Sequence, residues 1–132
     1  MQERDYYQWL QTQATALRSH EVEKIDWEGI AEALEDMGKS ERRAFSSRLA
    51  ILIMHLLKWD YQPNKRSRSW ELTIQEQRYQ LARLLEDNPS FRREISEFIE
   101  KAYPLAVIKA KKETGLENFP LSCPYDEKEI LD

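Results

Sequence analysis

Glycine, cysteine and histidine are all scarce in this sequence, which has three, one and two of them in 132 residues. Glycine usually makes up about 7% of a chain, and so few glycines argue against a turn-rich β fold and against a glycine-rich phosphate-binding loop. The single cysteine, Cys123, cannot close a disulfide within the chain. Two histidines and one cysteine also make a dedicated metal cage hard to assemble, so we expect no metal and no cofactor.

Long hydrophobic runs are missing as well. The most apolar stretch, residues 49–57, is about half as long as a membrane span and is interrupted by His55. Residues 1–5 lack the basic and apolar regions of a signal peptide. We therefore expect a cytoplasmic protein with no membrane partner.

What the sequence does contain is enough apolar material for a core. Apolar residues make up 41% of the chain, aromatic residues 11% and charged residues 33%. A chain of this length suits one domain that folds without metals or disulfides, so residues 1–132 are predicted to form a single all-α domain.

Three helices are predicted in the first half of the chain. Asp5 should cap the first helix, Asp26 the second and Ser40 the third, while Gly38 should close the second helix in the left-handed conformation. The third helix, up to residue 57, is apolar on most sides, which is typical of the centre of a bundle. The predicted buried stripes are Tyr6, Leu10, Ala14 and Leu17 in the first helix, and Ile30, Ala33, Leu34 and Met37 in the second.

The second half predicts two more helices and a tail. After a loop at residues 61–67, a fourth helix should end at Asn88, and a fifth should run from Pro89 to Gly115 with a kink or split at Pro104. Residues 116–132 should form an extended strap that ends in a short helix, capped by Asp126 with Glu129. The expected fold is a compact helical bundle of about five main helices with this C-terminal strap.

Charge is distributed unevenly along the chain. The formal net charge is -4, yet residues 42–70 contain seven basic residues and one acidic residue, so this segment is +6 and the rest of the chain is -10. Such a division is what opposite faces of one bundle need in order to pair. It is also what a segment that binds a negatively charged ligand would show.

The candidate binding site is the corner between the third and fourth helices, where basic side chains alternate with aromatic ones. This composition binds phosphate groups and stacks bases, and the start of the fourth helix beside Arg66 and Arg68 could also hold an anion. In the plainer alternative, the tryptophans are core anchors and the basic groups pair with carboxylates. The candidate residues, which we call the basic corner, are His55, Lys58, Trp59, Arg66, Arg68, Trp70 and Arg78.

A weaker candidate is acidic. Glu28, Glu32, Glu35 and Asp36 share one face of the second helix and could meet His55 in a metal or catalytic site. We expect them instead to pair with the three arginines that follow Gly38 or to face water. No nucleophile with a neighbouring base stands out, so no catalytic residue is predicted and an enzyme is disfavoured. The three arginines are Arg42, Arg43 and Arg48.

Several motifs in one order carry a resemblance to a known family. They are Asp5-Tyr6-Tyr7 with Trp9-Leu10, Glu35-Asp36-Met37-Gly38-Lys39-Ser40-Glu41-Arg42-Arg43, Met54-His55-Leu56-Leu57-Lys58-Trp59, Gln62-Pro63, Arg66-Ser67-Arg68-Ser69-Trp70, Gln75-Glu76-Gln77-Arg78, and Phe119-Pro120 with Cys123-Pro124-Tyr125. Together they resemble the bacterial family of domain of unknown function 29. The resemblance implies a compact all-α bundle and implies no activity, cofactor or functional residue.

The function that the sequence favours is a non-enzymatic cytosolic interaction or regulatory module. It would use the basic corner or an exposed aromatic residue such as Tyr7 or Trp27, with a protein partner or a second copy of the chain. The alternative is a nucleic-acid-binding domain that uses residues 58–70, which the acidic composition disfavours.

Overall fold

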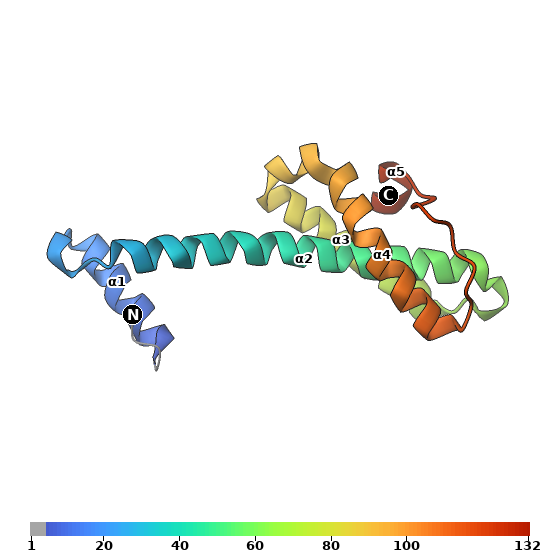
Figure 1. Ribbon diagram of the computed structural model, residues 1–132, viewed down its shortest axis with the longest axis horizontal. Helices are drawn as coiled ribbons and strands as arrows, with labels where there is room; N and C mark the ends of the chain where they lie inside the picture. The colour runs from blue at the N-terminus through green and yellow to red at the C-terminus, as the bar shows by residue number, and fades with distance from the viewer. Residues whose placement is uncertain (1–4) are drawn as a thin grey trace. The chain divides into compact units, whose positions relative to one another are not determined.

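The computed structural model describes residues 5–132, and no β-strand is present among them. Three short 3-10 helices, Val22–Lys24, Pro63–Lys65 and Pro89–Glu94, connect the α-helices. The α-helices are α1 (Tyr6–Arg18), α2 (Trp27–Tyr61), α3 (Arg68–Asp87), α4 (Ile95–Thr114) and α5 (Glu127–Leu131) (Figure 1). The predicted all-α class is confirmed.

The predicted break at Gly38 is wrong, because α2 continues through Gly38 and Ser40 as one helix of 35 residues. Glycine inside a helix costs only about 1 kcal/mol relative to alanine, so it permits a helix end without forcing one. Gly115, at the end of α4, is the glycine that adopts a left-handed conformation, with φ of 76°. The described chain divides into two compact units after Ser40.

The first unit is a helical hairpin formed by α1 and the beginning of α2. Both predicted N-caps are confirmed: the Asp5 side chain accepts a hydrogen bond from the Gln8 N–H, and Asp26 accepts one from the Gly29 N–H, at 2.9 and 3.0 Å. The buried Gln13 amide fixes the turn. Its Oε1 accepts from the Asp26 N–H at 2.7 Å, and its Nε2 donates to the Lys24 carbonyl at 3.2 Å.

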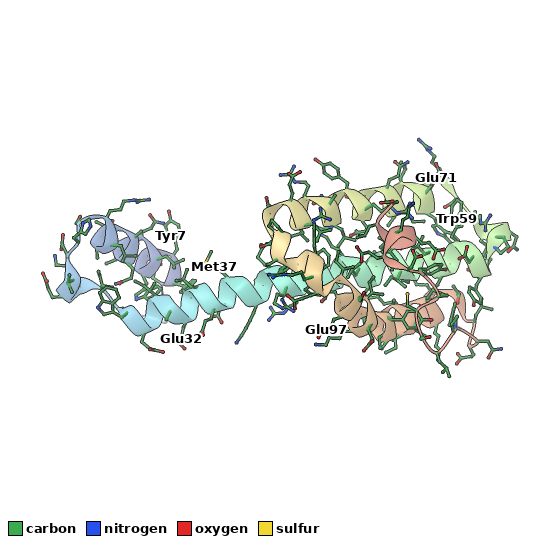
Figure 2. All side chains as sticks on the ribbon, turned by 90° about the horizontal axis from the view of Figure 1, so that it is seen from above. Tyr7, Glu32, Met37, Trp59, Glu71 and Glu97 are labelled. Carbon is green, nitrogen blue, oxygen red and sulfur yellow. The ribbon has the colours of Figure 1, made fainter. Side chains whose placement is uncertain are left out.

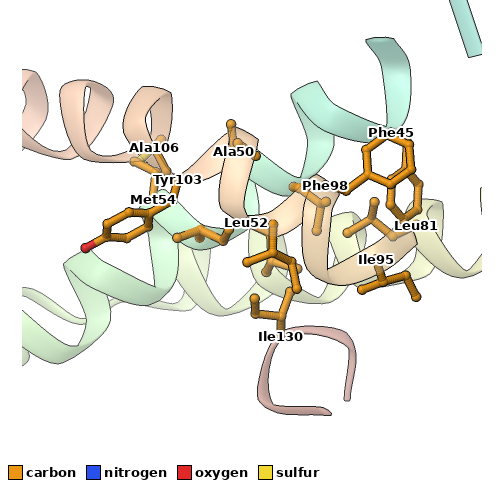
Figure 3. Packing of buried hydrophobic residues seen from close by; sticks show 14 of the residues in the cluster. Phe45, Ala50, Leu52, Met54, Leu81, Ile95, Phe98, Tyr103, Ala106 and Ile130 are labelled. Carbon is orange, nitrogen blue, oxygen red and sulfur yellow. The ribbon is translucent and has the colours of Figure 1, made fainter. Parts of the chain in front are cut away.

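The core of the second unit is built around the C-terminal part of α2, as predicted for the third helix. Phe45, Leu49, Leu52, Ile53 and Leu57 are completely buried. Side chains from the other helices of the unit surround them (Figure 3). The neighbours include Leu81 of α3, Ile95 and Phe98 of α4, and Ile130 of α5.

The α4 region differs from the prediction in two respects. The segment after Asn88 begins as a 3-10 helix, Pro89–Glu94, and becomes α-helical only at Ile95. Pro104 lies inside α4 and does not split it. The predicted end of the helix is confirmed, because the Gly115 N–H donates to the Lys111 carbonyl at 2.9 Å.

The C-terminal segment crosses the second unit as a strap of extended and bent backbone and ends in α5. The predicted cap is confirmed: Asp126 and Glu129 each accept a hydrogen bond from the other's backbone N–H. The Tyr103 hydroxyl donates to the Pro120 carbonyl at 2.7 Å, and the Tyr125 hydroxyl donates to Asp60 at 2.6 Å. Side-chain hydrogen bonds therefore hold the strap at two points. None of the helices described at residues 5–132 has the length and apolar character of a membrane span.

Candidate functional site

Lys58, the innermost base of the basic corner, is already bound within the protein. Its ammonium lies 2.6 Å from a carboxylate oxygen of Glu113 and 4.5 Å from the centre of the Trp70 ring. The side chain is only 8% exposed. Because Lys58 is covered by its partners, it is not available to a phosphate group.

Arg66 and Arg68, two of the three arginines of the corner, also have partners. Arg66 donates from Nε to the Trp59 carbonyl at 2.8 Å, and its guanidinium lies 4.8 Å from the centre of the Trp59 ring. Arg68, in the first turn of α3, donates to Glu71 at 3.0 Å. Two bases of the corner, Lys58 and Arg66, therefore lie over aromatic rings of the corner itself.

The remaining corner residues hold the fold together in the same way. Arg78 donates to the carbonyls of Glu129 and Ile130, both at 2.9 Å, and so satisfies the end of α5. His55 Nδ1 lies 3.0 Å from the Ile51 carbonyl, one turn earlier in α2. Trp59 and Arg78 line one cavity of about 300 Å³, whose wall also includes the acidic Glu71. Two contacts of the basic corner thus join helices: Lys58 links α2 to α4, and Arg78 links α3 to α5.

Of the two alternatives expected for the carboxylates of residues 28–36, they face water, since α2 has no turn at Gly38 that could bring them to the arginines. Arg42 forms a bidentate ion pair with Glu94, with N–O distances of 2.9 and 3.2 Å. The Arg42 guanidinium carbon lies 4.7 Å from the centre of the Phe98 ring. Hydrogen bonding to Arg42 lowers the pKa of Glu94. Arg48 donates instead to the Gln77 side chain at 3.2 Å.

The structure adds no support for a metal or catalytic site. Within residues 5–132, no three His, Cys, Asp or Glu side chains are close enough to hold one metal ion. The four candidate carboxylates of α2, Glu28, Glu32, Glu35 and Asp36, are exposed. Cys123 is partly buried, and burial raises the pKa of its thiol, so the group stays protonated at neutral pH.

The hairpin of the first unit shows the largest disagreement with the predicted core. The buried residues of α1 are Trp9, Gln13 and Ala16, and not the predicted stripe. Tyr6 and Leu17 of that stripe are 47% and 43% exposed. In the second predicted stripe Ala33 is buried, whereas Leu34 and Met37 are 62% and 64% exposed. Tyr7 and Trp27 are exposed aromatics, as the sequence suggested.

The exposed stripes of the two helices lie on the same side of the hairpin. In each helix the exposed stripe follows the buried one by one residue: Leu10 follows Trp9, and Leu34 follows Ala33. α1 runs obliquely back along the beginning of α2 (Figure 1), so the same rotation turns both stripes toward one side. We call this surface the hairpin face. It consists of Tyr6, Leu10, Ala14 and Leu17 of α1, with Ile30, Leu34 and Met37 of α2.

The acidic residues of the hairpin lie on another side of α2. Glu28, Glu32 and Glu35 follow the helical repeat as a separate stripe. Figure 2 shows Glu32 and Met37 on opposite sides of the helix. Residues 5–40 contain eight acidic and three basic residues, a net charge of -5. The hairpin is therefore apolar on one side and acidic on the other.

These observations define a helical protein in which Lys58 and Arg78 of the basic corner are bound within the fold and whose N-terminal hairpin exposes apolar side chains. The chain belongs to the family described as domain of unknown function DUF29, whose sequence model matches residues 1–132, the whole chain. No curated protein and no solved structure is significantly similar to it.

The residues of the hairpin face were predicted to lie in a core, so their exposure was not expected from the sequence. One signal was available: α1 carries two adjacent apolar stripes, one with Trp9 and Ala16 and one with Leu10 and Leu17. A single neighbouring helix covers only one such stripe.

Proposed function

We propose that this chain is a non-enzymatic protein-interaction module whose docking surface is the hairpin face. The observation that carries the proposal is the exposure of Leu34 and Met37, two large apolar side chains one turn apart on a well-formed helix. Tyr6 and Leu17, near the two ends of the corresponding stripe on α1, are exposed as well.

An uncovered surface of this kind is unusual for a chain that acts alone. Scattered apolar side chains on a protein surface are normal, but a contiguous patch of several hundred Å² commonly marks an interaction site. An apolar helix face with spacing i, i+3, i+4 and i+7 is also what a helical partner recognises. Ile30, Leu34 and Met37 have this spacing.

The charge of the hairpin supports a protein partner over a nucleic acid. A net charge of -5 over residues 5–40 repels a polyanion. The bases that could have attracted one, Lys58, Arg66 and Arg68, are engaged within the second unit. We also infer a cytosolic location, for which the lone protonated thiol of Cys123 is the supporting feature. We propose that both units belong to one domain, since α2 supplies residues to both.

The experiment compares the native size of complexes in cell extracts. The wild-type chain should elute in a larger species than the double variant Leu34→Glu/Met37→Glu. The matched control is Ile108→Glu, which places the same charge at a side chain that is also 62% exposed, on α4. The control should elute with the wild type. Equal sizes for all three proteins would contradict the proposal.

A further inference from the structure

We propose that the occupant of the hairpin face is a second copy of the same face, so that two hairpins form a four-helix bundle. The inference rests on the proposed function and names the partner of that surface. A two-helix hairpin supplies half of such a bundle, and its open side is where the other two helices would pack.

The exposed area has the size of a small interface. The exposed large apolar side chains of the hairpin face are between 43% and 64% exposed. At roughly 150–250 Å² for each fully exposed large side chain, they present on the order of 300–550 Å². A standard interface covers about 800 Å² on each partner, so the dimer should be a weak one. The side chains are Tyr6, Leu17, Leu34 and Met37.

The hairpin face is chemically self-complementary. A two-fold interface brings one patch against an identical patch, so any charge within it would meet a like charge. The hairpin face contains no charged residue, and Glu28, Glu32 and Glu35 form a separate stripe. Two copies can therefore approach without burying a carboxylate. A basic helical partner would fit less well, because the apolar face itself has no carboxylate to pair with its charges.

The acidic charge gives the dimer a salt dependence that separates it from a complex with a cationic partner. Each hairpin carries -5 over residues 5–40, so two copies repel at long range. Salt screens this repulsion and strengthens hydrophobic burial. Self-association should therefore tighten as salt rises, whereas the binding of a cationic partner should weaken.

The test is analytical ultracentrifugation of the purified full-length chain, from low micromolar to several hundred micromolar, at two salt concentrations. The wild type should be a dimer with a dissociation constant in the micromolar range that falls with added salt. Leu34→Glu and Met37→Glu should each weaken the dimer at least about tenfold, while Ile108→Glu should not. Circular dichroism confirms that each variant is folded, and Leu34→Ser serves as a milder second variant.

Either of two results would overturn the inference: a wild type that stays monomeric over this range, or a dimer that the hairpin-face variants leave unchanged. A monomeric pure chain that still enters a larger complex in extracts, sensitive to the hairpin-face variants, would refute the second copy and leave the proposed function standing. Loss of both effects would refute both proposals.

Discussion

Lys58 and Glu113 are 55 residues apart in the sequence, yet the Lys58 ammonium lies 2.6 Å from the Glu113 carboxylate. The contact joins the end of α2 to the end of α4, and the Trp70 ring of α3 covers the ammonium at 4.5 Å. Lys58 is nearly buried, whereas about half of the Glu113 side chain is exposed. Through this pair one base of the basic segment contributes to the packing of α2 against α4.

Removing the charge of Glu113 should destabilise the second unit. Glu113→Gln leaves a buried ammonium without its anionic partner, and we expect a loss of about 1–2 kcal/mol in the free energy of unfolding. Urea denaturation measures the loss. The control is Glu117→Gln, since Glu117 is 78% exposed and lies 4.0 Å from Lys111. An equal loss of unfolding free energy in both variants would show that the Lys58–Glu113 pair stabilises the fold no more than an exposed ion pair does.

The same pair should make the free energy of unfolding depend on pH in the acidic range. Hydrogen bonding to Lys58 lowers the pKa of Glu113 below its ordinary value of 4.5. The folded state therefore holds this carboxyl's proton less tightly than the unfolded state. The stabilisation is fully present above pH 4.5 and disappears as the pH falls below it. The difference in unfolding free energy between wild type and Glu113→Gln should shrink in acid. A difference that is constant with pH would contradict the assignment.

The stability that the strap contributes should fall at high pH, because the Tyr103 phenol ionises there. Burial raises the pKa of this phenol from 10.0 to about 12. The neutral phenol is thus favoured in the folded state, so its contribution is intact below pH 10 and is lost as the pH rises to about 12. Tyr103→Phe should cost about 1 kcal/mol at neutral pH, because the Pro120 carbonyl loses its donor. It should also flatten the loss of stability above pH 10. Ultraviolet titration of the phenols and denaturation at each pH check both effects.

Two glycines of α2 should respond in opposite ways to alanine. A Cβ at Gly29 would lie 2.6 Å from the Trp9 ring, whereas one at Gly38 would meet nothing within 4 Å. Gly29→Ala should force Trp9 away and destabilise the hairpin by about 1–3 kcal/mol. Gly38→Ala should stabilise the helix by about 0.4–1 kcal/mol. Hydrogen exchange of the α1 amides measures both changes. Stabilisation by Gly29→Ala would contradict the packing of α1 on α2.

Features that depend on neighbouring residues were predictable from the sequence. Asp5, Asp26 and Asp126 each cap a helix through an N–H three residues later, and Gly115 ends α4 because it can adopt a positive φ. The strongly apolar run around Leu52 also required a central position, which the structure confirms.

Features that depend on distant partners were not predictable. Gly38 can end a helix or lie within one, and the local sequence does not decide between them. Arg42 pairs with Glu94, which is 52 residues away, and many carboxylates were equally available to it in the sequence. The periodicity of α1 offered two apolar stripes, and only the position of α2 determines that Trp9 is buried while Leu17 is exposed.

The most direct test of the central claim is photo-crosslinking inside cells that produce the chain. A photoreactive phenylalanine derivative replaces Leu34 on the hairpin face or, as control, Glu32, which the helical repeat places on the opposite side of the same helix. The account predicts a discrete protein adduct from position 34 and none from position 32, with a second copy of the chain as the attached protein. An adduct to a different protein would refute the dimer alone. No adduct from position 34, or crosslinks confined to the same chain, would contradict the claim that the hairpin face is an interaction surface.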